Sequence, residues 1–379
     1  MKIARKQIYI LSFFYIYIPV VLIIAGWCNL WFAILSLSML GYAFYRTVFK
    51  GKQIDGEIQM KRTAVIVCVA VVLIFAYYAG WGGMVPQASD WGKHNAVLKD
   101  LMQKEWPVLY DNDGEHSMLT YYLGQYIVPA FCGKVLISIC RILKITDIFG
   151  LGIDIVSFFI AEATMFLWNC IGLSLVCLNL FFLLKNPSKK AIIIAAFCLF
   201  GNPLVLGKAV YGLAGNFVDF STYNWLDADN YMLQYSTNFV LIKWTFQHCL
   251  VPWLVTALMI GNCVEIKHYV VLGLPVAFFS PFGFLGVLPY MFADLAMQIF
   301  SKSKESRKEI IRSCFSIPNL FILFSLGTFL ILYYLDFYFA DGKPDTQQIE
   351  LYLQMNSKDL FAYAVFCLFT FGIYALYYK

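Results

Sequence analysis

Two residues that could do chemistry, Asp90 and His94, follow the third long apolar run and stand four positions apart. At about 100° per residue, a helix starting here would carry both on its apolar face with Val97, and Lys93 on the opposite face. A carboxylate held against an apolar surface has a raised pKa and can act as a general base, and the imidazole could orient it or bind a phosphate. The spacing also fits an amphipathic helix whose polar first turn faces water.

A second polar group lies further along the chain and comprises Lys243, Trp244, Gln247 and His248. On one continuous helix, Lys243 would stack on Gln247 and Trp244 on His248, one turn apart. Ionisable groups inside an apolar segment are costly and usually face a cavity or a partner. The alternative is a belt of interfacial tryptophans with a lysine whose ammonium reaches toward water.

Acidic residues elsewhere are weaker candidates. Asp154 and Glu162 lie two turns apart in one apolar run, where either could instead be a buried acid paired with a lysine. Asp227 and Asp229 could hold a divalent cation through oxygen ligands. Two acids in a loop are also a common solvated pattern, so we predict no metal site and no cofactor.

The elements that must position these residues are membrane spans. Only 13% of the 379 residues are charged and 61% are hydrophobic, whereas an ordinary soluble domain has roughly a quarter charged. An apolar helix of about 20 residues crosses the hydrocarbon core. We therefore predict an all-α polytopic membrane protein, one membrane domain over residues 1–379, with about ten transmembrane helices: Ile8–Ala25, Leu30–Phe49, Thr63–Met84, Leu151–Leu184, Ala191–Leu206, Phe239–Cys263, Tyr269–Ser280, Phe282–Phe300, Ile317–Leu335 and Leu360–Tyr378.

Basic residues predict the orientation. Lys and Arg cluster near residues 2–6, 46–62, 185–190 and 302–312, and the positive-inside rule makes that side cytoplasmic. Both termini then lie inside, and the outer loops are 85–150, 207–238 and 336–359. The apolar stretch Leu119–Leu143 would reverse every later span if it crossed, so we predict a pair of juxtamembrane helices at the outer interface.

The layout resembles integral membrane glycosyltransferases of the GT-C fold. Asp90, within SDWGKHN, the Leu119–Leu143 element and the span after it are similar to the acid, juxtamembrane helices and returning helix of such enzymes. The string WTFQHCLVPW from Trp244 to Trp253 resembles a Trp-x-Pro-Gln-His-x-x-x-x-Trp pattern of bacterial multi-pass proteins of this type. Three features depart from the family: the acid follows the third span, it lacks a neighbouring second acid, and Phe246 replaces the proline. No large C-terminal soluble domain follows either.

The resemblance implies a bacterial inner-membrane enzyme that moves a sugar from a polyprenyl-phosphate carrier to an acceptor at the extracytoplasmic face. Asp90 would be the catalytic base, and the partners would be the lipid-linked donor and membrane lipids, without nucleic acid. The substrate-binding residues would be Lys93, His94, Glu162, Lys243, Trp244, Gln247 and His248. Two alternatives stay open: a polysaccharide polymerase or flippase, which should have an outer loop with several arginines, and a transporter, which should have an internal repeat. Arg141 is the only arginine predicted outside, and no repeat is visible.

Overall fold

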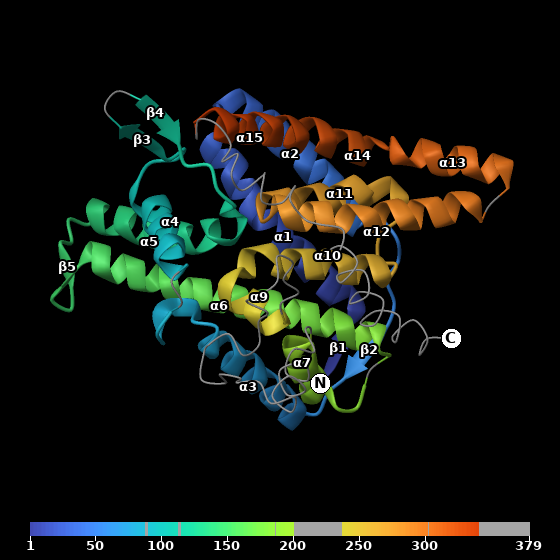
Figure 1. The fold of residues 1–379 in the computed structure, drawn as a ribbon, viewed down its shortest axis with the longest axis horizontal. Helices are drawn as coiled ribbons and strands as arrows, with labels where there is room; N and C mark the ends of the chain where they lie inside the picture. Colours follow the sequence, from blue (N-terminus) through green and yellow to red (C-terminus); the bar gives the residue numbers. More distant parts are fainter. Residues whose placement is uncertain (88–89, 113–114, 186, 201–236, 302, 341–379) are drawn as a thin grey trace, which may run out of the picture.

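The computed structural model describes residues 1–87, 90–112, 115–185, 187–200, 237–301 and 303–340. These residues form helices and three two-stranded hairpins (Figure 1). The hairpin strands are antiparallel: β1 (Lys2–Ala4) with β2 (Glu57–Gln59), β3 (Leu109–Asn112) with β4 (Glu115–Met118), and β5 (Asp147–Ile148) with β6 (Leu151–Gly152). The predicted span Leu360–Tyr378, the acids Asp227 and Asp229, and nearly all of the loops 207–238 and 336–359 lie outside the described residues.

Four helical segments of the described chain are long and apolar enough to cross a membrane. They are α1 (Arg5–Trp27), α6 (Ile153–Leu183), α12 (Pro281–Phe300) and the segment Glu305–Tyr334. The last comprises most of α13 (Lys304–Cys314), α14 (Ile317–Ile322), the π-helical turn η6 (Leu323–Gly327) and the start of α15 (Thr328–Ala340). The mostly helical architecture is thus confirmed, and these four segments fit a membrane protein by their length and composition.

The remaining helices are shorter, and the prediction of ten full spans in a GT-C layout does not fit the described part of the chain. Several apolar runs that are long enough to span a membrane do not form one continuous helix. The run after Thr63 stops at Tyr78 because Gly80, Gly82 and Gly83 have positive φ. The other elements are α2 (Leu30–Val48), α3 (Arg62–Tyr78), η1 (Trp81–Gly83), α4 (Trp91–Gln103), η2 (Leu123–Gln125), α5 (Ile127–Ile142), α7 (Lys190–Leu199), α9 (Asn238–Trp244), η3 (Phe246–His248), α10 (Leu250–Ile260), η4 (Ile266–His268), α11 (Tyr269–Gly273) and η5 (Leu274–Phe278).

The four basic clusters gather at one end of the molecule, which we call the basic end. Lys2 pairs with Glu57 at 3.5 Å across the β1–β2 hairpin, which joins the first two clusters. The Arg5 guanidinium donates to the Gly261 carbonyl at 2.8 Å and lies 5.8 Å from the Phe182 ring, next to the third cluster. The fourth is carried by α13, which packs on η4 just beyond Gly261. This grouping agrees with the common side that the positive-inside rule requires.

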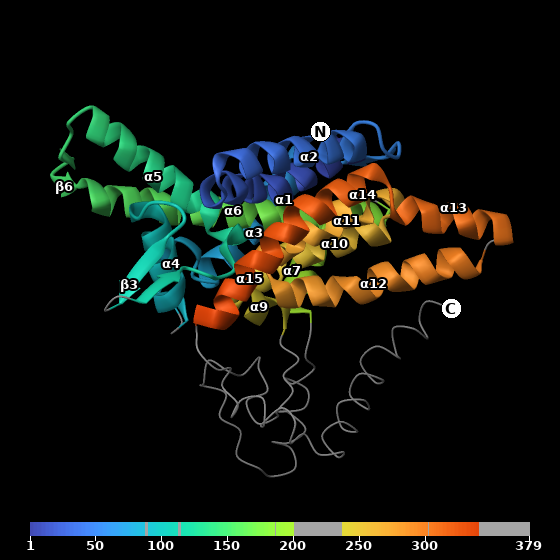
Figure 2. The ribbon, with the colours of Figure 1, turned by 90° about the horizontal axis from the view of Figure 1, so that it is seen from above.

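The opposite end, which we call the hairpin end, carries β3–β4 and β5–β6 (Figures 1 and 2). The segment Leu119–Leu143 enters the bundle from this end. Deep inside, Gln125 donates to the Tyr15 hydroxyl at 2.8 Å and contacts Asn169 of α6. α5 then returns along α6 to the hairpin end. The segment thus runs in from the hairpin end and returns to it, and its residues Leu123–Ile127 are buried in the bundle, which differs from the predicted pair of helices at an interface.

Candidate functional site

The predicted helix after residue 90 exists as α4, and it is amphipathic. Its buried face carries Trp91, His94, Val97 and Leu101. Asp90 occupies the N-cap position, but its side chain is exposed and caps no backbone N–H. The expectation that Asp90 lies on the apolar face is therefore wrong. The rings that pack on this helix reach Trp91 and His94, and Asp90 stands at the helix end beside them.

His94 is a buried connector between three elements. Its Nε2 lies 3.3 Å from the Trp244 carbonyl of α9, and its Nδ1 lies 2.6 Å from the Tyr126 hydroxyl. Because a carbonyl oxygen only accepts, Nε2 carries the hydrogen and Nδ1 accepts from Tyr126. Burial lowers the pKa of the imidazole, against opposing effects of the Trp244 carbonyl and Asp90. Both ring nitrogens are used in these hydrogen bonds, so His94 positions other residues. No ring nitrogen is left for the phosphate binding that the sequence predicts.

Two tryptophans complete the same connection. The last carbonyls of a helix have no partner within it, and α9 ends with three in succession. Trp81 donates Nε1–H to the Ile242 carbonyl and Trp91 to the Lys243 carbonyl, both at 3.1 Å, beside the His94 bond to Trp244. Side chains from η1 and α4 thus cap α9 from outside.

This capping explains a further correction. The run Phe239–Cys263 does not form one helix, because η3 separates α9 from α10. Lys243 and Gln247, and likewise Trp244 and His248, therefore do not stack on one helical face. Pro252, at the third position of α10, has no N–H to extend the helical ladder back into η3.

The break places Gln247 and His248 beside the start of α4. The Phe246 ring stacks on Trp91 with centroids 5.3 Å apart and planes at 16°. Asp90 precedes Trp91, and Gln247 and His248 follow Phe246, so the stacked pair joins the backbone segments that carry these three residues. In Figure 1, α4 lies toward the hairpin end and α9 lies nearer the middle of the bundle.

Gln247 and His248 keep atoms available for a ligand. Gln247 is 3% exposed, and its Oε1 has no hydrogen-bond partner within the described residues. An unpaired buried polar atom is costly and needs an explanation. His248 is half-buried, and its Nδ1 lies 2.7 Å from the Ser280 hydroxyl. Its Nε2 has no partner in the described part of the chain.

Aromatic residues from the segment Leu119–Leu143 and from α12 contact the His248 ring. The Tyr122 ring meets the His248 ring edge-on, with ring centroids 4.7 Å apart. The Phe282 ring also meets the His248 ring edge-on, with centroids 5.8 Å apart. Burial raises the pKa of the neighbouring Tyr121 to about 12, with smaller effects of Tyr122 and Asp90.

The other predicted site residues lie around this region. Lys243 and Trp244 are half-buried at the end of α9, and Lys93 is exposed on α4. Glu162 of α6 faces a narrow crevice that it shares with Trp91 and His94. It also packs against η1, where a Cβ on Gly83 would come within 2.7 Å of its Oε1.

Two residues of the site escaped the sequence reasoning. Ser280 caps α12 by accepting from the Gly283 N–H at 2.7 Å while contacting His248. The Ser-Pro pair at 280 and 281 is a helix-start signal that could have found it. Tyr122 gave no signal, because its partner His248 lies far along the chain.

Within the described residues, no group of three or more His, Cys, Asp and Glu side chains is placed to hold a metal ion. No known protein family, curated protein or solved structure matches this chain.

Proposed function

We propose that this protein is a membrane glycosyltransferase that moves a sugar from a polyprenyl-phosphate carrier to an acceptor hydroxyl at the hairpin end, outside the cytoplasm. The observation that carries the proposal is the Trp91–Phe246 stack, which packs the start of α4, next to Asp90, against η3, which contains Gln247 and His248. The proposal is supported by the exposed Asp90 carboxylate at the start of α4, and by the half-buried His248 imidazole and the unpaired Gln247 oxygen in η3, at the break between α9 and α10.

The chemistry assigns these groups separate tasks. The acceptor oxygen attacks the sugar C1, the bond from C1 to the carrier phosphate oxygen breaks, and the carrier phosphate leaves with the electron pair. Asp90 accepts the proton from the acceptor hydroxyl as general base. The leaving phosphate is anionic, so His248 and the nearby Lys243 ammonium would stabilise it by charge-assisted hydrogen bonds. Gln247 Oε1 would accept a hydrogen bond from a sugar hydroxyl.

The site's surroundings suit a lipid-linked donor. Tyr122 and Phe282 offer apolar rings beside His248, and sugar rings pack on aromatic faces. A donor carried on a polyprenyl chain must be met within the bilayer, and the apolar helical segment Phe246–Ile260, which includes α10, begins at the site. Glu162 and Trp244 would lie at its margin.

The test is sugar transfer from a polyprenyl-phosphate donor by the purified protein. We expect Asp90→Asn to lower turnover by about a hundredfold to ten-thousandfold, which is the usual contribution of a general base. Asp147→Asn removes an exposed acid at the same end and is the matched control, with wild-type turnover expected. Thermal stability is compared for all variants so that misfolding is recognised.

His248→Asn should act differently from Asp90→Asn. Because a phosphate contact present in both the bound and transition states is uniform binding, its loss raises KM for the donor more than it lowers kcat. Wild-type turnover in a stable Asp90→Asn protein would exclude Asp90 as the base, and Glu162 and Asp154 would be tested next.

A further inference from the structure

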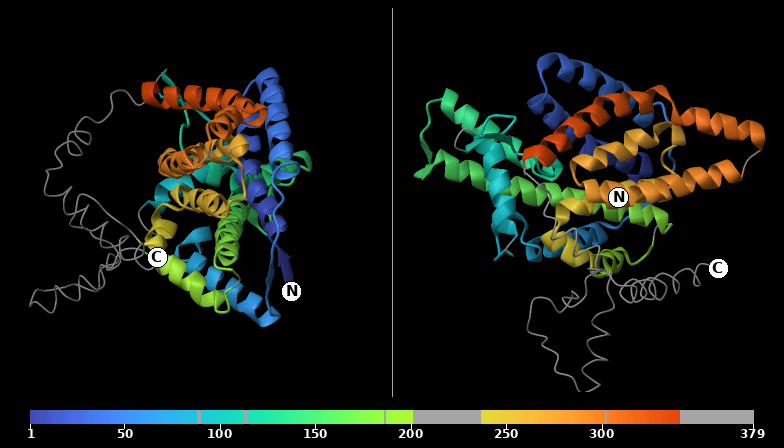
Figure 3. Two further views of the ribbon diagram at one scale, coloured as in Figure 1. Left: turned by 90° about the vertical axis from the view of Figure 1, so that its right-hand side faces the viewer. Right: turned by 45° about the horizontal axis from the view of Figure 1, so that its top comes forward.

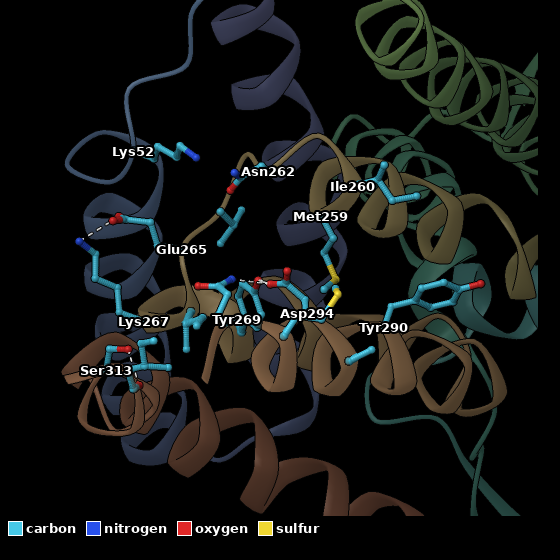
Figure 4. A pocket seen from close by; sticks show the side chains of 16 residues that line it. Lys52, Met259, Ile260, Asn262, Glu265, Lys267, Tyr269, Tyr290, Asp294 and Ser313 are labelled. Carbon is cyan, nitrogen blue, oxygen red and sulfur yellow. Dashed lines mark hydrogen bonds and ion pairs between the residues drawn. The ribbon is translucent and has the colours of Figure 1, made fainter. Parts of the chain in front are cut away.

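A groove of about 720 Å³ lies at the basic end, away from the site described above. It is bounded by the end of α10, η4, the start of α11, α12 and α13. Figure 4 shows that its two sides differ. Lys52 and Glu265 lie on one side, Ile260 and Tyr290 lie on the other, and Asp294 lies between the two sides beside Tyr269.

Asp294 is the unusual residue of this groove. It belongs to α12, one of the segments apolar enough to cross a membrane. Its Oδ2 accepts from the Tyr269 hydroxyl and from Gln298 Nε2, the latter at 2.7 Å. Both donors are neutral, and Asp294 has no ion pair with any described residue. Its Oδ1 also has no hydrogen-bond donor there. An acid within a span usually has a cationic partner, and none of the described residues pairs with Asp294.

The groove also carries an uncompensated positive charge. Glu265 and Lys267 pair with each other at 2.9 Å at the rim, so their charges cancel locally. Lys52 is exposed at the mouth, near Asn262, and forms no ion pair with the described residues. The groove therefore offers one cation at its mouth and one carboxylate oxygen further inside.

The apolar side of the groove is open. Ile260 and Met297 are each 64% exposed and Tyr290 is 57% exposed. Val287 is the only residue of α12 that is fully buried in the described structure. α12 lies along an edge of the described bundle (Figure 2 and Figure 3, left). Large apolar side chains along an edge helix suit contact with hydrocarbon chains.

We propose that this groove binds a phospholipid whose headgroup carries both a phosphate and a primary ammonium, as in phosphatidylethanolamine. The ammonium donates to Asp294 Oδ1, the phosphate lies toward Lys52, and an acyl chain packs along Ile260 and Met297. A quaternary ammonium such as choline has no N–H to donate, so it does not satisfy Oδ1. A headgroup without an ammonium leaves the Asp294 charge unpaired.

The test is lipid binding by the purified protein, measured by native mass spectrometry after exchange with phosphatidylethanolamine, phosphatidylcholine or phosphatidylglycerol of identical acyl chains. We expect the wild type to retain phosphatidylethanolamine on the order of tenfold more tightly than the other two, as for one charge-assisted hydrogen bond. Asp294→Asn should remove this preference. Lys52→Gln should weaken retention of all three lipids alike, because each carries the phosphate.

Two further variants complete the design. Asp147→Asn, which removes an acid at the other end, should bind lipid as the wild type does. Met297→Trp fills the apolar side at an exposed position that tolerates a larger side chain, and it should reduce phosphatidylethanolamine retention even if Asp294→Asn folds poorly. Equal retention of the three lipids by the wild type, or unchanged retention in Met297→Trp, would overturn the proposal. The readout is lipid binding, so the result does not depend on sugar transfer.

Discussion

At the scale of single residues, His94 illustrates how a residue that suits catalysis can serve positioning. Its two nitrogens are committed to Trp244 and Tyr126, and its ring is 3% exposed. A neutral imidazole is therefore built into the folded state. Protonation would put a second hydrogen on Nδ1, which now accepts the Tyr126 hydroxyl hydrogen, and would place a charge in a buried setting.

This arrangement predicts how stability depends on pH. Because the pKa of His94 is lower in the folded protein than the value of about 6.5 in the unfolded chain, the unfolded chain binds the proton more tightly. The stabilisation is complete above about pH 6.5 and is lost as pH falls, by at most about 1.4 kcal/mol per pH unit. Thermal unfolding of His94→Gln should therefore change less between pH 7.5 and pH 5 than that of the wild type.

The control for this prediction is Lys93→Gln, which alters the exposed neighbour on the same helix. It should keep the wild-type dependence on pH. An equal acid sensitivity in His94→Gln and the wild type would show that other groups control the loss of stability.

At the scale of elements, the ending of α9 depends on side chains from other elements. Trp81, Trp91 and His94 cap its last three carbonyls. Trp91→Phe keeps the ring that stacks on Phe246 but removes the donor to the Lys243 carbonyl. We expect a loss of about 1–2 kcal/mol of stability, and faster amide hydrogen exchange over residues 238–249.

Trp31→Phe is the matched control, because Trp31 is 81% exposed on α2. Its unfolding and exchange should resemble those of the wild type. Exchange over residues 238–249 that does not respond to Trp91→Phe would mean that α9 ends independently of this cap.

The turn η1 depends on its glycines. Gly82 has φ of 77°, and a Cβ there would also come within 3.0 Å of Phe166. Gly82→Ala should therefore destabilise the protein by about 1 kcal/mol or more.

Gly92→Ala is the matched control, since Gly92 is exposed in α4 and no atom lies near its added Cβ. It should leave thermal stability unchanged or raise it by up to about 1 kcal/mol. Equal effects of the two substitutions would contradict this reading of the turn.

At the scale of the whole molecule, the grouping of basic residues predicts an orientation. Cysteines introduced at Asp111 and Asp147, both exposed at the hairpin end, should react with a membrane-impermeant reagent from outside the cell. A cysteine at Glu305, exposed on α13 at the basic end, should react only after the membrane is opened. The unsubstituted chain gives the background from native cysteines. Protection of Asp147→Cys together with outside labelling of Asp111→Cys would show that Leu119–Leu143 crosses the membrane.

The sequence by itself determined the class of protein, the apolar helices α1 and α6, the amphipathic α4 and the sign of charge at one end. These follow from local composition and periodicity, which act within a few turns of chain. Pro and Gly positions also indicated where several apolar runs are interrupted.

Only the tertiary structure decided where helices end and which polar groups remain available. α9 stops where Trp81, Trp91 and His94 take its carbonyls, and the positions of these side chains depend on packing across more than a hundred residues of chain. The same packing buries His94, leaves Asp90 exposed and brings Tyr122 to His248. Hydrogen-bond partners that are distant in sequence leave no periodic signal. The spacing of Asp90 and His94 therefore predicted that they lie one helical turn apart. It could not show that His94 positions other residues while Asp90 stays free to contact a substrate.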